Sequence, residues 1–216
     1  MFRVTARTVL ELGSELISSD VIAFYELIKN GFDAKTENGV EVRFDVVLGL
    51  RSFSSLRNRS NEQEVPLQNL KERCLSELNS GAAKLYDRAR ETIAAARSYD
   101  EISKALSAVY SLNSIHVIDT GTGMSATDLE EKFLVIGTPS RKIAVEKSVA
   151  DGQKKPDFLG EKGLGRLSAM RLGGTLSIET ARKKDSKLNH LEIDWRAFED
   201  VNKMIEDIDI KASTSG

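Results

Sequence analysis

Three polar residues in the segment YELIKNGFDA, residues 25 to 34, have a spacing that could support chemistry. On a helix that turns roughly 100° per residue, Glu26, Asn30 and Asp33 project within about 60° of one another. The amide oxygen of Asn30 suits Mg²⁺, which takes few protein ligands and keeps its waters and the phosphate oxygens of a nucleotide. Glu26, one turn earlier, is placed to polarise an attacking water. The alternative interpretation of this stripe is a solvated helix face.

Two glycine motifs could bring the backbone close to a ligand. In IDTGTGM, residues 118 to 124, Asp119 ends a predicted strand and is followed by Gly121 and Gly123, which admit a flat ligand. In GEKGLGR, a predicted helix is preceded directly by Gly160, Gly163 and Gly165. That geometry aims backbone N–H groups at an anion. Each motif alone is equally typical of simple turns, strand ends and helix caps.

The elements that must position these residues are predicted from periodicity and caps. Ser19 is the predicted N-cap of a helix that reaches residue 34, with Asp20 in its first turn. Strands are predicted at residues 40–50, 114–120, 175–180 and 190–195. Ser125 and Asp128 have the spacing of a capping box ahead of a short helix. Residues 137 to 157 are polar without strong periodicity, which predicts a loop.

The stretch between the first two predicted strands, about residues 51–112, opens rich in Ser and Arg. It then places apolar residues at helical spacing, namely Leu67, Leu70, Cys74, Leu75 and Leu78. We therefore predict a helical insertion. Two roles stay open for it: a packing element or longer connection, and a surface that binds a partner.

Composition narrows the class of protein. With 216 residues, 40% hydrophobic and 30% charged, the sequence predicts one globular domain with an insertion. The net charge of −2 and the absence of a basic tail give no sign of nucleic-acid binding. One cysteine and no Cys/His cluster exclude a disulfide framework and a structural zinc site. The sequence shows no signal-peptide pattern and no apolar run long enough to span a bilayer, so we expect a cytoplasmic protein without membrane contact.

Taken in order, these features resemble the GHKL ATPase superfamily. That superfamily includes DNA gyrase B subunits, ninety-kilodalton heat-shock chaperones, histidine kinases and MutL mismatch-repair proteins, with the MORC ATPases close by. The shared order is a helix with ExxxNxxDA, a strand ending in DxGxG, a polar loop, a GxxGxG helix start and a strand carrying a threonine. The resemblance covers residues from about 9 to 45 and 113 to 196 and omits the insertion. It implies an α+β fold: a two-layer α/β sandwich of the Bergerat type, with a mixed sheet facing helices, over residues 1–216.

The resemblance also implies roles for individual residues. Glu26 resembles the general base, Asn30 the Mg²⁺ ligand, and Asp33 the acid that supports the adenine-side water network. Asp119 resembles the residue that accepts a hydrogen bond from the adenine amino group, a contact that selects adenine over guanine. The other nucleotide-binding positions are Gly121, Gly123 and Met124 beside the adenine, Thr180 in the water network, Gly160, Lys162, Gly163, Leu164 and Gly165 at the phosphates, and Thr138 and Lys142 at the start of the lid. For Lys162 the alternative is a solvated loop lysine.

The resemblance implies ATP and Mg²⁺ as cofactors and hydrolysis of ATP by the nucleotide-switch domain of a larger protein. Closure of an ATP lid at about residues 137–159 would exclude water and drive homodimerisation or the remodelling of a protein or DNA client, which stays open. Relatives complete the site with a lysine or arginine from a following domain, so we expect slow hydrolysis by this chain alone. One alternative is a phosphotransferase of the sensor-histidine-kinase type, although such kinases generally have Asn where Glu26 stands. The other is a non-hydrolysing nucleotide-sensing module.

Overall fold

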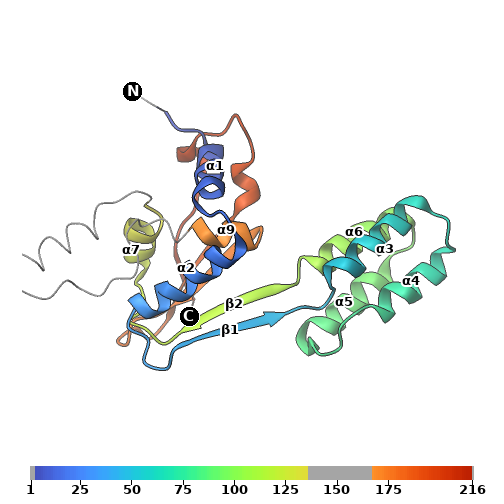
Figure 1. Cartoon of the computed structure of the whole chain (residues 1–216), viewed down its shortest axis with the longest axis horizontal. Coiled ribbons are helices and arrows are strands. Elements are labelled where there is room, and N and C mark those ends of the chain that lie inside the picture. The colour runs from blue at the N-terminus through green and yellow to red at the C-terminus, as the bar shows by residue number, and fades with distance from the viewer. Residues whose placement is uncertain (1–2, 136–166, 216) are drawn as a thin grey trace, which may run out of the picture. The chain divides into compact units, whose positions relative to one another are not determined.

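The computed structural model describes residues 3–135 and 167–215 of the chain (Figure 1). It mixes helices with small sheets, which confirms the α+β class. The chain divides into two compact units: Met1–Glu41 with Val117–Gly216, and Val42–His116. We call them the split unit and the inserted unit. None of the described helices combines the length and the apolar character needed to cross a membrane.

The split unit begins with two helices, α1 (Ala6–Leu16) and α2 (Asp20–Asp33). The N-cap prediction for α2 is confirmed, because the side chain of Ser19 accepts a hydrogen bond from the backbone N–H of Ile22 at 3.2 Å. Helix α2 ends at Asp33, and Lys35 follows with a left-handed φ of 60°. Such a conformation stops a helix and turns the chain away from its axis.

The sheet of the split unit has the antiparallel order β3 (Thr175–Thr180), β4 (Leu188–Asp194) and β5 (Ser213–Ser215). Its shorter elements are α7 (Ala126–Asp128), the π-helical turn η1 (Leu129–Phe133), α9 (Ser168–Leu172) and the 3₁₀ turns η3 (Trp195–Phe198) and η4 (Ile205–Asp207). In the β3–β4 register, Leu191 lies opposite Ile178 and Ile193 lies opposite Leu176. Leu191 and Ile193 join a core with residues of α1, η1 and η3: Ala6, Val9, Leu129, Trp195 and Phe198. Burying each large side chain contributes roughly 1.5–3 kcal/mol.

Strands β1 (Val40–Asp45) and β2 (Ser114–Asp119) pair as a two-stranded antiparallel sheet that leads into and out of the inserted unit (Figure 1). Four helices follow β1: α3 (Leu50–Glu62), α4 (Leu67–Ser76), α5 (Ala83–Ala95) and α6 (Tyr99–Tyr110). Their apolar faces meet in one core, which includes Leu56, Leu70, Cys74, Ile93 and Leu106. Burial raises the pKa of the Cys74 thiol to about 11, so this cysteine is an inert packing residue.

The prediction of a strand over residues 40–50 is wrong in its second half. Strand β1 ends at Asp45, and the next residues leave the ladder because Val47 and Leu48 are fully buried in the core of the inserted unit. Their backbone N–H groups both donate to Oδ1 of Asn113, at 2.9 and 3.3 Å. A side chain therefore replaces the partner strand at this point.

Candidate functional site

The segment that directly follows α2 is hydrogen-bonded to the turn that follows β2. The N–H of Thr122 donates to the carbonyl of Ala34 at 2.9 Å, and the N–H of Thr120 donates to Oγ1 of Thr36 at 3.1 Å. A Cβ added at Gly31 would lie 3.1 Å from Cβ of Asp119, so the helix and the strand end approach closely. These contacts hold Asp119 beside the helix that carries Asn30.

Asp119 lies on the exposed side of this junction. Its Oδ1 accepts a hydrogen bond from the N–H of Gly121 at 2.8 Å, which fixes the orientation of the carboxylate. No described residue bonds to its other oxygen, Oδ2. The carboxylate is therefore oriented while it keeps one acceptor for a ligand.

Asn30 and Asp33 are both half-buried on α2. The side-chain amide of Asn30 makes no hydrogen bond with another residue in the described ranges. An unused amide oxygen on a rigid helix is a suitable ligand for a hard cation. The donor chemistry of this residue therefore fits magnesium.

Glu26 has a partner that the sequence reasoning missed. Its Oε1 lies 2.7 Å from Nζ of Lys29, whose side chain is only 6% exposed. The Lys29 ammonium also lies 5.5 Å from the ring centroid of Tyr25, within range of a cation–π contact. The available signal was a lysine one turn after Glu26 in a segment otherwise suited to a core, because a buried ammonium needs a partner.

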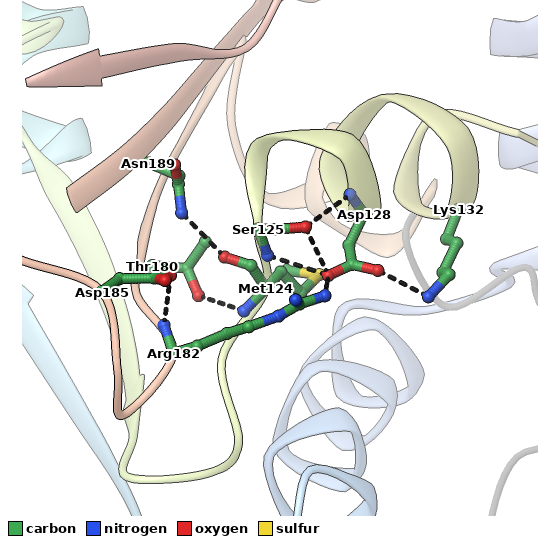
Figure 2. A network of polar contacts seen from close by, with 8 residues as sticks. All are labelled: Met124, Ser125, Asp128, Lys132, Thr180, Arg182, Asp185 and Asn189. Atoms are coloured by element: carbon green, nitrogen blue, oxygen red, sulfur yellow. Dashed lines mark hydrogen bonds and ion pairs between the residues drawn. The ribbon is translucent and has the colours of Figure 1, made fainter. Parts of the chain in front are cut away.

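The glycine turn packs closely against the end of β3. Gly123 has a φ of 65°, and a Cβ there would lie 1.9 Å from the carbonyl oxygen of Ala181. The next residue, Met124, is held from both sides (Figure 2): its N–H donates to Oγ1 of Thr180 at 3.0 Å, and its carbonyl accepts from Nδ2 of Asn189 at 3.0 Å. Thr180 thus braces the backbone beside Met124. Asn189, a buried residue, had no signal in the sequence.

A second polar network centres on Asp128 (Figure 2). The capping box is confirmed: Ser125 donates to Oδ2 of Asp128 through N–H at 2.9 Å and through Oγ at 2.7 Å, and its Oγ accepts from the Asp128 N–H at 3.1 Å. Lys132 Nζ lies 2.5 Å from Oδ1, and Arg182 donates to Oδ2. Lys132 and these Ser125 donors, together with Arg182, hold the pKa of Asp128 well below its ordinary value.

Eight of the predicted site residues are described, and all lie in the split unit: Glu26, Asn30, Asp33, Asp119, Gly121, Gly123, Met124 and Thr180. The others lie outside the described residues: Thr138, Lys142, Gly160, Lys162, Gly163, Leu164 and Gly165.

In a comparison with protein families, residues 96–215 match the family described as histidine kinase-, DNA gyrase B-, and HSP90-like ATPase. The match includes the Asp119 turn and the sheet β3–β4–β5, and it begins after α2. Comparisons with curated proteins and with solved structures find no match. Because the family match spans more than half of the 216 residues, the chain belongs to the GHKL family of ATP-binding domains, the histidine kinase-, gyrase B- and HSP90-like ATPases.

Proposed function

We propose that this chain binds ATP with Mg²⁺ and hydrolyses it as the nucleotide-switch domain of a larger protein. The family supports ATP binding in general. The observation that carries the proposal is the hydrogen-bonded junction between α2 and the Asp119 turn. It holds the amide of Asn30 and the carboxylate of Asp119 in one braced unit, and each keeps an oxygen that no described residue uses.

Asp119 is the proposed determinant for adenine. Its Oδ2 can accept a hydrogen bond from the exocyclic amino group of adenine, whereas guanine presents a carbonyl oxygen at the same position. With guanine, the carboxylate oxygen and the carbonyl oxygen would both be acceptors, so they could form no hydrogen bond and both would be poorly solvated. Met124, held by Thr180 and Asn189, supplies apolar surface next to the base.

Glu26 is the proposed general base, and Asn30 is the proposed protein ligand of Mg²⁺. The metal, when bound, neutralises charge on the phosphate oxygens. Because Lys29 occupies only Oε1 of Glu26, the other oxygen can accept a proton from a water. A lid at about residues 137–159, homodimerisation of a longer protein, one ATP-binding domain over residues 1–216 and a cytoplasmic setting are further parts of this proposal, and they rest on the resemblance and on composition.

A non-hydrolysing nucleotide sensor is the second candidate. The ion pair between Glu26 and Lys29 favours it, because this pair occupies one oxygen of the proposed base. The two candidates differ in one measurable property: the sensor binds ATP without releasing phosphate. A phosphotransferase of the sensor-kinase type would instead leave radiolabelled phosphate on the protein.

The test measures ATP binding by calorimetry and phosphate release with magnesium present, for the 216-residue chain and its variants. Glu26→Ala should lower phosphate release by about 10²–10⁴-fold, the usual contribution of a general base, and leave ATP binding intact. Glu37→Ala, which removes an exposed carboxylate after the end of α2, is the matched control. Equal rates in the wild-type and Glu26→Ala proteins would reject Glu26 as the base.

The adenine contact has its own test. Asp119→Ala should weaken ATP binding by about tenfold or more, the cost of losing a hydrogen bond to a charged group. Binding of GTP, weak in the wild type, should not fall in parallel. Undiminished ATP binding by this variant would overturn the proposed orientation of the base.

A further inference from the structure

The turn between β3 and β4 and the segment α7–η1 border an open pocket of about 640 Å³. It is lined by loop 122–124, Asp128, Lys132 and residues 182–185. We call it the hairpin pocket. Its volume is in the range of small-ligand sites, and none of Glu26, Asn30, Asp33 or Asp119 lines it. The proposed function makes no use of its charged residues.

The described lining of the hairpin pocket carries more positive than negative side chains. Lys132 and Arg182 approach Asp128 from different elements, and Figure 2 shows Arg182 reaching from the hairpin to the carboxylate that Lys132 also contacts. The side chain of Asp128 is only 10% exposed, whereas those of Lys132 and Arg182 are 75% and 48% exposed. One carboxylate therefore contacts two cations, and the half-exposed guanidinium of Arg182 can still donate to a further anion.

Two more cations lie on the hydrogen-bonded turn between β3 and β4. The N–H of Asp185 donates to the carbonyl of Arg182 at 2.9 Å, and the carboxylate of Asp185 accepts from the N–H of Arg182 at 2.9 Å. This four-residue turn places Lys183 and Lys184 at its two central positions. Both line the pocket, and neither makes a hydrogen bond or an ion pair with a described residue. The lining thus holds four cationic side chains against two carboxylates.

We infer that the hairpin pocket binds a phosphate group of an anionic ligand. Arg182 contributes a planar fork of donors to the lining, and Lys183 and Lys184 contribute ammonium groups, the combination that suits phosphate oxygens. A free phosphorylated molecule and the backbone of a polynucleotide share this chemistry. Met124 connects the two sites, since it lines the hairpin pocket and is the proposed apolar neighbour of adenine.

The experiment uses the 216-residue chain without ATP and two probes, inorganic pyrophosphate by calorimetry and a fluorescent single-stranded oligonucleotide by anisotropy. The double variant Lys183→Ala with Lys184→Ala should bind the probe with an affinity about tenfold weaker, the combined effect of losing two exposed ion pairs. With the oligonucleotide, the salt dependence of log K should also become shallower by about 0.7 for each lost phosphate contact.

The matched control is the double variant Lys187→Ala with Lys203→Ala. It changes the net charge by the same amount in the same unit, and both lysines are exposed and outside the pocket lining. Binding of pyrophosphate alone would identify a free phosphorylated ligand, and tighter binding of the oligonucleotide would identify a polynucleotide. The inference is overturned if neither probe binds or if the two double variants weaken binding equally.

A third variant separates this site from the nucleotide site. With magnesium present, Asn30→Ala should leave pyrophosphate binding unchanged, because Asn30, the proposed metal ligand at the ATP phosphates, does not line the hairpin pocket. Loss of pyrophosphate binding in this variant would assign the probe to the nucleotide site and reject the hairpin pocket. If the wild-type protein bound pyrophosphate but did not bind ATP, the proposed function would be rejected and the inference about the hairpin pocket would stand.

Discussion

The buried ammonium of Lys29 determines how the carboxylate of Glu26 can act. A lysine whose side chain is only 6% exposed must keep its partner, and the contact at 2.7 Å fixes Oε1 while no described residue bonds to Oε2. Lys29 is therefore a positioning residue for the proposed base. Lys29→Met should lower kcat for ATP hydrolysis by about 10–100-fold and leave KM for ATP nearly unchanged, because orientation, not nucleotide binding, is lost.

Two controls make this prediction specific. Lys29→Arg keeps a cation near Glu26 and should recover part of kcat. Lys211→Met removes a lysine whose side chain is 76% exposed and should leave both constants unchanged. An unchanged kcat in Lys29→Met, or a rise in KM alone, would contradict the positioning role.

Gly123 is the residue at which the turn tolerates no side chain. A Cβ would meet the carbonyl oxygen of Ala181 at 1.9 Å, and the φ of 65° is itself unfavourable for alanine. Gly123→Ala should lower the free energy of unfolding by about 2–3 kcal/mol, measured by urea denaturation. The control is Gly174→Ala, where nothing lies within 4 Å of the added Cβ. Its effect should stay within about 0.5 kcal/mol, and similar losses in both variants would contradict the steric argument.

Single residues also show how far the sequence could predict the site. Spacing and resemblance indicate Asn30 and Asp119 as candidate site residues, because the chemistry of their side chains is visible in local motifs. The hydrogen bond from Thr120 to Thr36 joins positions 84 residues apart, and no local pattern reports it. Lys29 was missed for a related reason: its burial depends on the packing around α2, which the helical spacing alone does not specify.

Helix α7 has a charged side chain, Asp128, in its capping box. Folding lowers the pKa of Asp128 below its ordinary value of 3.8, because the Lys132 ammonium and the Ser125 donors favour the carboxylate. The ionised side chain therefore stabilises the fold at pH values above about 4, and this contribution is lost as the pH falls below that value toward the lower pKa of the folded protein.

Asp128→Asn should lower the free energy of unfolding by about 1–2 kcal/mol at pH 7, the cost of a lost cap and its charged hydrogen bonds. The difference from the wild type should shrink at low pH, where the wild-type carboxylate is itself protonated. Denaturation curves at several pH values measure both effects. Asp209→Asn, at a carboxylate 75% exposed, is the control and should show neither. A difference that stays constant with pH would exclude Asp128 as the titrating group.

The element boundaries show where local pattern and tertiary packing disagree. Alternation in VEVRFDVVLGL predicted one strand over residues 40–50, and β1 ends at Asp45. Val47 and Leu48 are as apolar as strand residues, but Asn113 binds their N–H groups and the helices of the inserted unit bury them. In contrast, α2 and the capping box were predicted correctly, because their caps lie within three residues of the groups they satisfy.

Across the whole chain, most of the buried apolar residues in the described ranges fall into two separate clusters. One includes Leu106 and lies in the inserted unit, and the other includes Leu191 and lies in the split unit. Both leucines are fully buried, so each replacement by alanine should cost about 2–5 kcal/mol. Because the two cores share no buried residue, we expect the units to unfold in separate steps in scanning calorimetry.

Leu106→Ala and Leu191→Ala form a matched pair for this expectation. Leu106→Ala should lower the transition of the inserted unit and leave the other in place, and Leu191→Ala should do the reverse. ATP with magnesium should raise only the transition that Leu191→Ala lowers, since a ligand stabilises the unit that binds it and the proposed site lies entirely in the split unit. A single transition that both substitutions lower equally would mean that the two cores unfold as one cooperative body, and the inserted unit would then be part of the support for the nucleotide site.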